Sequence, residues 1–292
     1  MREYKIWLAK IVTVFVLMLF FFAAIGRLSD TVELVRGDRV AVIEIGGIIE
    51  DATEVLRSLY HEVRDNDTKA IVLRVDSPGG AVAPSEEIYN AVRRLKAEKP
   101  IVVSMGSMAA SGGLYSSLAA SKIFCQPGTQ TGSIGVIMQI PNFSTIADKV
   151  GFSMVTVKSG ALKDAGNQFR PMTDDERKFL EGTARKVHVQ FIQAVAEGRN
   201  IPEAKVREFA DGRVILGTEA KELGLVDDFG DVYDAARAAL ELAHVPLKKD
   251  EVPNLVFTHK KKGFLSKLAD ASSSLPSLMG SELIPSLQYI AR

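Results

Sequence analysis

The sequence predicts an α/β fold with a mostly parallel sheet, because apolar runs of strand length alternate with amphipathic helical stretches. The first three runs cover 40–45, 70–75 and 101–103. A helix follows each of the first two runs and keeps one apolar face: Val55, Leu59 and Val63 in the first helix, Ile88, Val92 and Leu95 in the second, which begins near Ser85. Strands that are joined by crossover helices pair in parallel.

The rest of the folded region continues this alternation in shorter pieces. We expect strands at 122–125, 154–157 and 213–216, and a turn-rich segment at 131–136. A long helix from about 174 to 197 has a predicted buried stripe of Leu180, Ala184, Val187, Phe191 and Val195. An alanine-rich helix is expected at 231–243.

Composition limits the classes of partner. The 292 residues suffice for one large domain with additional segments. Lys plus Arg and Asp plus Glu number 36 each, so the composition provides no net field for nucleic acid. The single cysteine, Cys125, lies in an apolar run and is predicted to be a buried thiol. No cluster of His, Cys and carboxylates has metal-ligand spacing, so no metal or other cofactor is expected.

The N-terminal 27 residues predict a membrane segment. Residues 11–26 carry no charge, and together with 7–9 they approach the length that spans a hydrocarbon core. A retained signal anchor is favoured over a cleaved signal peptide, for which 24–26 is the alternative cleavage site. The basic N-terminus then stays cytoplasmic, residues 7–26 contact membrane lipid and the rest of the chain is exported.

Four segments follow from these patterns. They are an anchor at 1–27, a linker at 28–38, a folded domain at 39–246 and a C-terminal tail at 247–292. The tail is partly amphipathic, because a basic stretch at 259–262 precedes an apolar one. It is interpreted either as a solvated tail or as a segment that contacts an anionic membrane or a neighbouring subunit.

The stretch 104–117 gathers small residues around Ser111, directly after an apolar strand and before a helix. A hydroxyl that attacks a carbonyl needs such a turn, with glycines that let a peptide backbone approach, and Gly112 and Gly113 meet that need. The alternative interpretation is that Ser111 only caps the helix.

A nucleophilic serine needs a base. His61 and His188 lie on predicted helices, where a packing or surface role is more common than a catalytic one, although a triad through His188 stays open. A lysine is the better candidate.

Five stretches occur in a fixed order along the folded domain: Arg-Val-Asp-Ser-Pro-Gly-Gly at 74–80, Ser-Met-Gly-Ser-Met-Ala-Ala-Ser-Gly-Gly at 104–113, Thr-Gly-Ser-Ile-Gly-Val at 131–136, Lys-Ser-Gly-Ala-Leu-Lys-Asp at 158–164 and Gly-Leu-Val-Asp at 224–227. Together they resemble the signal peptide peptidase A family of membrane-bound serine-lysine peptidases, in its short single-domain form. The resemblance implies a Clp protease/crotonase-like superhelix of repeated β-β-α units with a mostly parallel sheet, preceded by an N-terminal transmembrane helix.

The resemblance also implies roles for individual residues. Ser111 is the nucleophile and Lys163 the general base, while Ser133 supplies a hydroxyl that orients the lysine amine. The backbone amides of Gly80 and Gly112 form the oxyanion hole, with Gly80 in a flexible Pro-Gly-Gly turn.

A lysine acts as a base only when neutral, which requires burial that lowers its pKa from ~10.4 to ~7 to 8. The resemblance therefore demands an apolar pocket around Lys163 without a close carboxylate. Asp164 adjoins this lysine and would oppose the shift, so its side chain is predicted to point elsewhere. Lys158 is the local rival for the base.

The resemblance implies a membrane-anchored endopeptidase that degrades remnant signal peptides and misfolded exported proteins. It further implies a ring-like homo-oligomer in the bacterial cytoplasmic membrane, with a single pass and the catalytic domain on the extracytoplasmic side. Two alternatives stay open. A crotonase-type acyl-CoA enzyme would share the fold, but coenzyme A is cytoplasmic, and a non-catalytic membrane scaffold would use Ser111 only as a cap.

Overall fold

The computed structural model describes residues 38–258 and 288–290, and the isolated positions Trp7, Thr13 and Met18. Apart from these three positions, the predicted anchor lies outside the described residues, as do almost all of the linker and the basic amphipathic part of the tail. Within the described part of the chain, no helix is long and apolar enough to cross a membrane. The chain divides into units at 1–37 and 38–292, and the second is described below.

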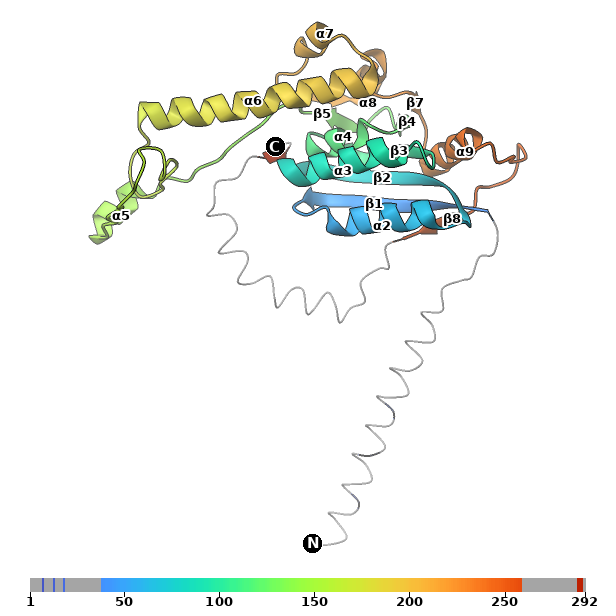
Figure 1. Cartoon of the computed structure of the whole chain (residues 1–292), viewed down its shortest axis with the longest axis horizontal. Helices are drawn as coiled ribbons and strands as arrows, with labels where there is room; N and C mark the ends of the chain where they lie inside the picture. The colour runs from blue at the N-terminus through green and yellow to red at the C-terminus, as the bar shows by residue number, and fades with distance from the viewer. Residues whose placement is uncertain (1–6, 8–12, 14–17, 19–37, 259–287, 291–292) are drawn as a thin grey trace. The chain divides into compact units, whose positions relative to one another are not determined.

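The sheet is mostly parallel, as predicted. Its strand order is β6-β5-β3-β2-β1-β8, and β4, β7 and β9 pair alongside this path (Figure 1). Among the described strands, the pairings of β2 with β9 and of β5 with β6 are antiparallel, and the others are parallel. The bounds are β1 Arg39–Ile49, β2 Thr68–Ala81, β3 Ile101–Ala109, β4 Lys122–Cys125, β5 Gln130–Gly132, β6 Val214–Leu216, β7 Asp228–Phe229, β8 Leu255–Phe257 and β9 Gln288–Ile290.

Helices cover both faces of the sheet. Alternate side chains of β1 separate two cores, because successive residues of a strand point to opposite faces. Ala41 and Ile43 join the core under α2, α3, α4 and the end of α6, whereas Val40 and Val42 join the core under α9. The bounds are α2 Thr53–Arg64, α3 Val82–Leu95, α4 Gly112–Ser117, α5 Ser144–Val150, α6 Asp174–Arg199, α7 Glu203–Arg207, α8 Gly217–Glu222 and α9 Val232–Leu242. The thiol of Cys125 is buried, as predicted, and burial raises its pKa to about 11.

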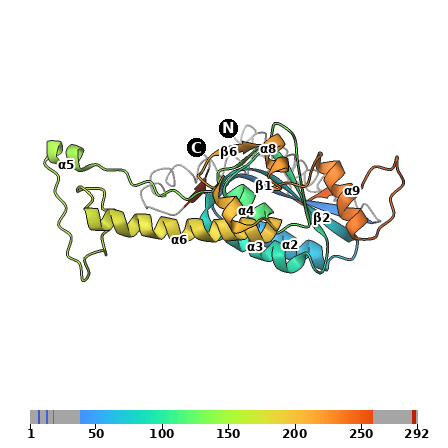
Figure 2. The ribbon, with the colours of Figure 1, turned by 90° about the horizontal axis from the view of Figure 1, so that it is seen from above.

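The region between β5 and α6 differs from the prediction. No strand forms at 154–157, where Val155 and Val157 are 88% and 95% exposed and none of the described strands pairs with them. The predicted stripe of α6 is buried only at Phe191 and Val195. Figures 1 and 2 show the reason, since α5 and the first half of α6 extend beyond the sheet. We call residues 137–173 the arm.

The sheet also continues past the predicted end of the domain at residue 246. β8 pairs with β1, and β9 pairs with β2, so two segments of the predicted tail belong to the sheet. Short strands of this kind are difficult to recognise because three residues carry too little periodicity.

Candidate active site

Ser111 lies in the turn between β3 and α4, as predicted. Its backbone has φ 52° and ψ −114°, a conformation that L residues rarely adopt and that costs ~1–3 kcal/mol. The Ser111 N–H donates to the carbonyl of Gly132 at 2.9 Å, which holds the turn in place. The side chain is fully buried and makes no capping bond to α4, so the capping interpretation is wrong.

The predicted flexible Pro-Gly-Gly turn is instead a continuation of β2. Gly79 and Gly80 pair with Ile48 and Ile49 of β1, so this backbone is held in the sheet, although Gly79 has a positive φ of 104°. A Cβ built at Gly80 would lie 2.1 Å from the carbonyl oxygen of Ile49, which explains why a glycine is needed there. The prediction failed because Pro and Gly also occur where a second backbone packs closely against a strand.

The two predicted oxyanion-hole glycines lie together beside the Ser111 turn. A Cβ built at Gly112 would lie 3.1 Å from the amide nitrogen of Gly80 and 2.6 Å from Ser85 Oγ. Gly112 is the residue after Ser111 and the first residue of α4. The Gly80 amide nitrogen therefore lies close to Gly112, as an oxyanion hole that uses both amides requires.

Ser133 is also brought to this turn. It follows Gly132, whose carbonyl accepts the Ser111 N–H, and its own N–H donates to the Arg213 carbonyl at 2.7 Å. Ser133 is buried and has φ 50°. Its position beside Ser111 is compatible with the supporting role that the resemblance implies.

Lys163 is not enclosed with these residues. It lies in the arm, in a turn closed by the Lys163 N–H and the Gly160 carbonyl at 3.1 Å, and it is exposed. The arm extends away from the sheet and α4 in two views (Figures 1 and 2). The expected apolar pocket is therefore not formed around Lys163 by the described residues of a single chain.

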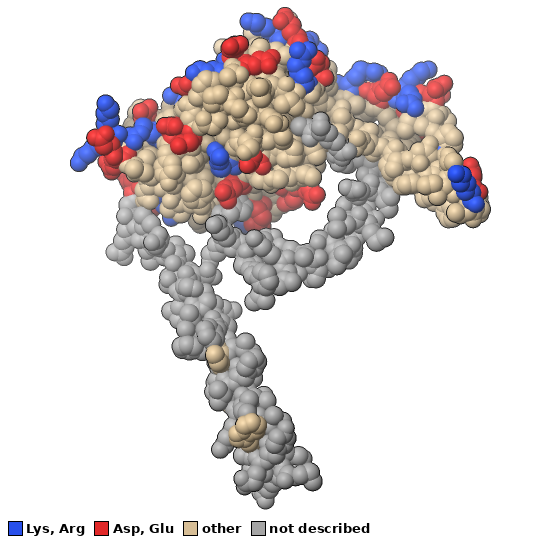
Figure 3. Space-filling view, turned by 180° about the vertical axis from the view of Figure 1, so that it is seen from behind, with Lys and Arg blue, Asp and Glu red and all other residues tan. Residues whose placement is uncertain are grey.

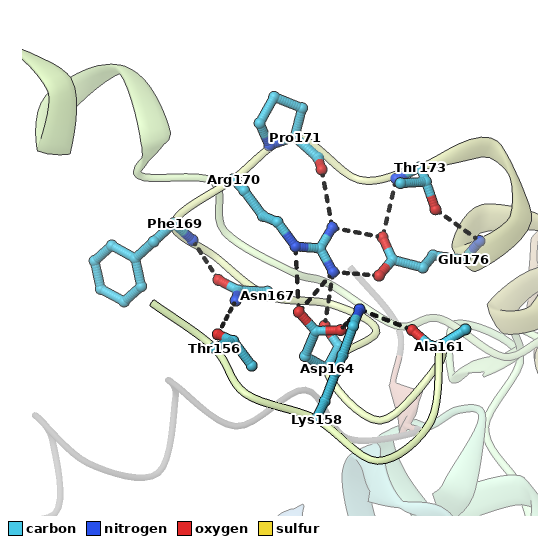
Figure 4. Close-up of polar contacts among 10 residues, drawn as sticks. All are labelled: Thr156, Lys158, Ala161, Asp164, Asn167, Phe169, Arg170, Pro171, Thr173 and Glu176. Atoms are coloured by element: carbon cyan, nitrogen blue, oxygen red, sulfur yellow. Dashed lines mark hydrogen bonds and ion pairs between the residues drawn. The ribbon is translucent and has the colours of Figure 1, made fainter. Parts of the chain in front are cut away.

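Arg170 ties the Lys163 turn to the start of α6 (Figure 4). Its guanidinium donates to Asp164 at 2.9 Å and to Glu176 at 2.9 Å. Glu176 in turn accepts from the Thr173 N–H in the capping box of α6. Asp164 also accepts from Lys158, so its carboxylate points to Lys158 and Arg170, away from the adjacent lysine as predicted.

The hydrogen bonds of this network join oppositely charged side chains, which makes them stronger than neutral ones. Hydrogen bonds from Lys158 and Arg170 lower the pKa of Asp164 to about 2, and those from Arg170 and Thr173 lower the pKa of Glu176 to about 2. Lys158 also donates to the Ala161 carbonyl at 2.9 Å, so its Nζ is hydrogen-bonded within the loop. Arg170 was not predicted from the sequence as a site residue, although the pattern Thr173-x-x-Glu176 signals a capping box.

Two buried side-chain atoms among the described residues have no hydrogen-bond partner, Ser111 Oγ and His188 Nε2. An unpaired buried polar group costs about 1–3 kcal/mol. A hydroxyl kept at that cost in a strained turn is typical of a reactive site rather than of packing. His188 stays the histidine alternative for the base.

The chain is similar to known proteases. The model of peptidase family S49 matches residues 93–246, and that of Clp protease matches 29–132. A putative protease of Synechocystis sp. is 37% identical over 82% of this chain and 86% of its own length. The putative signal peptide peptidase SppA of Enterococcus faecium is 35% identical over 68% of this chain and 61% of its own. Protease 4 of Haemophilus influenzae is 33% identical over 71% of this chain and 35% of its own.

A solved ClpP1 mutant from Listeria monocytogenes aligns over 66% of this chain and 93% of its own, with a TM-score of 0.46 and 19% identity. The molecule is a serine peptidase. It belongs to peptidase family S49, and the predicted resemblance to signal peptide peptidase A is confirmed. The acyl-CoA enzyme and the inert scaffold are both set aside by this membership.

Replacement of Gly112 by alanine is expected to lower kcat/KM by about 100-fold, because the new methyl group enters the space between the two amides. The same methyl meets Ser85 Oγ, so a modest fall in Tm is expected as well. Gly128→Ala is the control, since a Cβ built there meets nothing within 4 Å. Full activity of Gly112→Ala in a fluorogenic peptide assay would remove Gly112 from the site.

Replacement of Arg170 by alanine is expected to lower kcat about tenfold without unfolding the protein, because the Lys163 turn loses its connection to α6. Arg177→Ala is the control, because Arg177 is an exposed residue of α6. Because both carboxyl pKa values are lowered, the network is intact above about pH 4 and is lost as the pH falls towards about 2. Unchanged kcat in Arg170→Ala would contradict this positioning role.

Proposed function

We propose that this protein is a membrane-anchored endopeptidase that degrades remnant signal peptides with Ser111 as nucleophile and Lys163 as general base. The observation that carries the proposal is the Ser111 turn itself. The turn has a strained backbone, a buried Ser111 hydroxyl without a hydrogen-bond partner among the described residues, and the backbone amides of Gly80 and Gly112 beside it. The substrate class is supported by the relative named signal peptide peptidase and by the apolar N-terminal segment.

The proposed reaction follows from these groups. The neutral amine of Lys163 takes the proton from Ser111 Oγ, and the oxygen attacks the carbonyl carbon of a peptide bond. The amides of Gly80 and Gly112 stabilise the oxyanion. The protonated lysine then gives its proton to the leaving amine, and a water molecule hydrolyses the acyl-enzyme with the lysine again as base.

We further propose that Lys163 acts on Ser111 of a neighbouring copy in a ring-like homo-oligomer. The arm supports this, because it carries Lys163 away from its own Ser111 turn and exposes many apolar side chains. These are Ile146, Val150, Phe152, Met154, Val155, Val157, Leu162 and Phe169. In Figure 3 the arm, at the right, has a largely uncharged surface. An apolar surface of this kind fits packing against another chain, which would also desolvate the lysine.

The location follows from the anchor prediction. We propose a single pass through the bacterial cytoplasmic membrane, with the N-terminus in the cytoplasm and the catalytic domain on the extracytoplasmic side. Remnant signal peptides are left in the same membrane, so an anchored peptidase meets them by lateral diffusion.

The test uses the full chain in detergent with a fluorogenic peptide taken from the apolar core of a signal peptide. We expect hydrolysis of this peptide and at least about tenfold less of one with a charged core. A fluorophosphonate probe, which labels an activated serine without any substrate preference, is expected to label wild type and not Ser111→Ala. Labelling without hydrolysis of any signal-derived peptide would reject the substrate, and absence of both would reject the site.

A further inference from the structure

Ser77 is a fully buried polar residue at a position where the strand pattern predicts an apolar side chain. It follows Leu73 and Val75 in the series of alternate β2 residues that point into the core covered by α2, α3 and α4. Burial of a hydroxyl is costly unless it is hydrogen-bonded. The partners of this hydroxyl therefore show what it holds in place.

The Ser77 hydroxyl connects β1 to the Gly79–Gly80 segment of β2. Its Oγ donates to the Gly47 carbonyl at 2.6 Å and accepts from the Gly79 N–H at 3.0 Å. The register of the two strands shifts at 46–48, so the regular ladder is interrupted just before Gly80. The hydroxyl supplies the contact between the strands at this interruption.

The same hydroxyl sets the direction of the Gly80 N–H. The Gly79 carbonyl oxygen lies 3.5 Å from Ser77 Oγ, at the far limit of a hydrogen bond. In a planar trans peptide the C=O and the N–H point in opposite directions. A Gly79 carbonyl that faces Ser77 therefore turns the Gly80 N–H away from it, and the Gly80 nitrogen lies 3.1 Å from a Cβ built at Gly112.

The backbone cannot hold this peptide by itself. Gly79 has φ 104°, and glycine adopts positive and negative φ with similar ease, so the peptide between two glycines rotates easily. Other residues do not fit, because a Cβ built at Gly79 or Gly80 would lie 2.0 or 2.1 Å from a neighbouring carbonyl oxygen. The close approach that requires glycines thus also requires a separate hold on their peptide.

The main chain of Ser77 contacts the other half of the site. Its carbonyl accepts from the Ala110 N–H at 3.1 Å, and a Cβ built at Gly113 would lie 2.9 Å from the same oxygen. Ala110 and Gly113 directly flank Ser111 and Gly112. One residue therefore holds the nucleophile turn with its main chain and the oxyanion strand with its side chain.

We propose that the Ser77 hydroxyl is a positioning group of the oxyanion hole, which fixes the Gly79–Gly80 peptide so that the Gly80 N–H faces the oxyanion before substrate binds. The inference rests on the proposed function of the Ser111 turn. A donor that is already in place stabilises the transition state without reorganisation, whereas a donor that rotates must first be ordered. The contacts of the hydroxyl are to the backbone of the protein, so its loss is expected to slow the reaction and not to weaken peptide binding.

The kinetic test compares Ser77→Ala with Ser117→Ala in the full chain. Each variant removes a fully buried hydroxyl that donates to a backbone carbonyl, so similar falls in Tm are expected. Ser77→Ala is expected to lower kcat about 100-fold at unchanged KM, because the Gly80 donor is no longer held, whereas Ser117→Ala keeps its kcat.

Ser77→Cys keeps the size of the side chain with a weaker donor and acceptor, and is expected to lose about tenfold in kcat. This variant decides the question if Ser77→Ala does not fold. Wild-type kcat in a folded Ser77 variant, or an equal loss of kcat in Ser117→Ala, would overturn the proposal.

The binding test separates the oxyanion from the rest of the ligand. The probe is a tripeptide aldehyde with leucine side chains, and Ser111 Oγ bonds to its aldehyde carbon. The serine proton goes to Lys163, and the electron pair of the carbonyl double bond moves to the oxygen, which becomes the oxyanion. The matching peptide alcohol forms no such bond and is the control ligand.

Ser77→Ala is expected to weaken binding of the aldehyde about 100-fold, measured by calorimetry, and to leave binding of the alcohol unchanged. Equal weakening of both ligands would show that the hydroxyl only shapes the groove, and unchanged binding of the aldehyde would show that it holds no oxyanion donor. Either result would overturn the proposal.

Failure of this inference differs from failure of the proposed function. A wild-type chain that hydrolyses peptides, with Ser77→Ala equal to it in both tests, would reject the positioning role alone. A wild-type chain that hydrolyses no peptide and does not bind the aldehyde would reject Ser111 as the nucleophile, and the positioning role with it.

Discussion

Replacement of Ser111 by alanine is expected to lower kcat/KM for peptides by about 10⁴-fold, with no loss of stability. The hydroxyl makes no hydrogen bond with the described residues, so its removal breaks no interaction among them and relieves an unpaired buried group. Activity and Tm are measured on the same preparation. Loss of activity at unchanged Tm separates the loss of a nucleophile from the loss of a fold.

Ser117→Ala is the matched control, because Ser117 is buried in the same helix and its hydroxyl donates to the Gly113 carbonyl at 2.7 Å. This variant is expected to lose about 1 kcal/mol of stability and to keep its activity. If Ser111→Ala stayed active while the control behaved as expected, another residue would have to be the nucleophile.

Replacement of Lys163 by alanine is expected to lower kcat about 10³-fold, because the serine loses the group that takes its proton. Lys163→Arg is expected to be equally impaired, since a guanidinium stays protonated and cannot act as a base. Lys178→Ala, an exposed lysine of α6, serves as the control and is expected to retain full activity. The arginine variant distinguishes a base from a positive charge that only binds substrate.

The histidine alternative is tested in the same series. His188→Gln is expected to keep most of the activity, although the buried His188 Nε2 lacks a partner among the described residues. Activity that survives in Lys163→Ala and disappears in His188→Gln would assign the base to the histidine.

Local patterns predicted the central sheet and the Ser111 turn well. Long apolar runs and the small residues after β3 have few alternative structures, so β1 to β4 and the start of α4 lie where the sequence predicts them. Gly112 also indicated close backbone approach, whereas β2 continues through Gly79 and Gly80, which were expected to form a turn.

Contacts between distant segments could not be predicted. The aromatic partners of Tyr289 come from α4 and α6, and nothing near Gln288–Ile290 signals the pairing with β2. In the arm, by contrast, a strand was predicted that does not form. Its apolar residues at 154–157 suggested a strand, but burial of these side chains depends on what packs against the arm and not on local propensity.

The most direct test of the account mixes two inactive full-length variants, Ser111→Ala and Lys163→Ala, by co-expression, and measures peptide hydrolysis by the purified assembly. If Lys163 of one copy serves Ser111 of the next, about one quarter of the sites in a random assembly combine both groups, and activity returns to about one quarter of wild type. If the mixture is as inactive as either variant alone, the lysine does not act across copies, and the proposed assembly of the site is wrong.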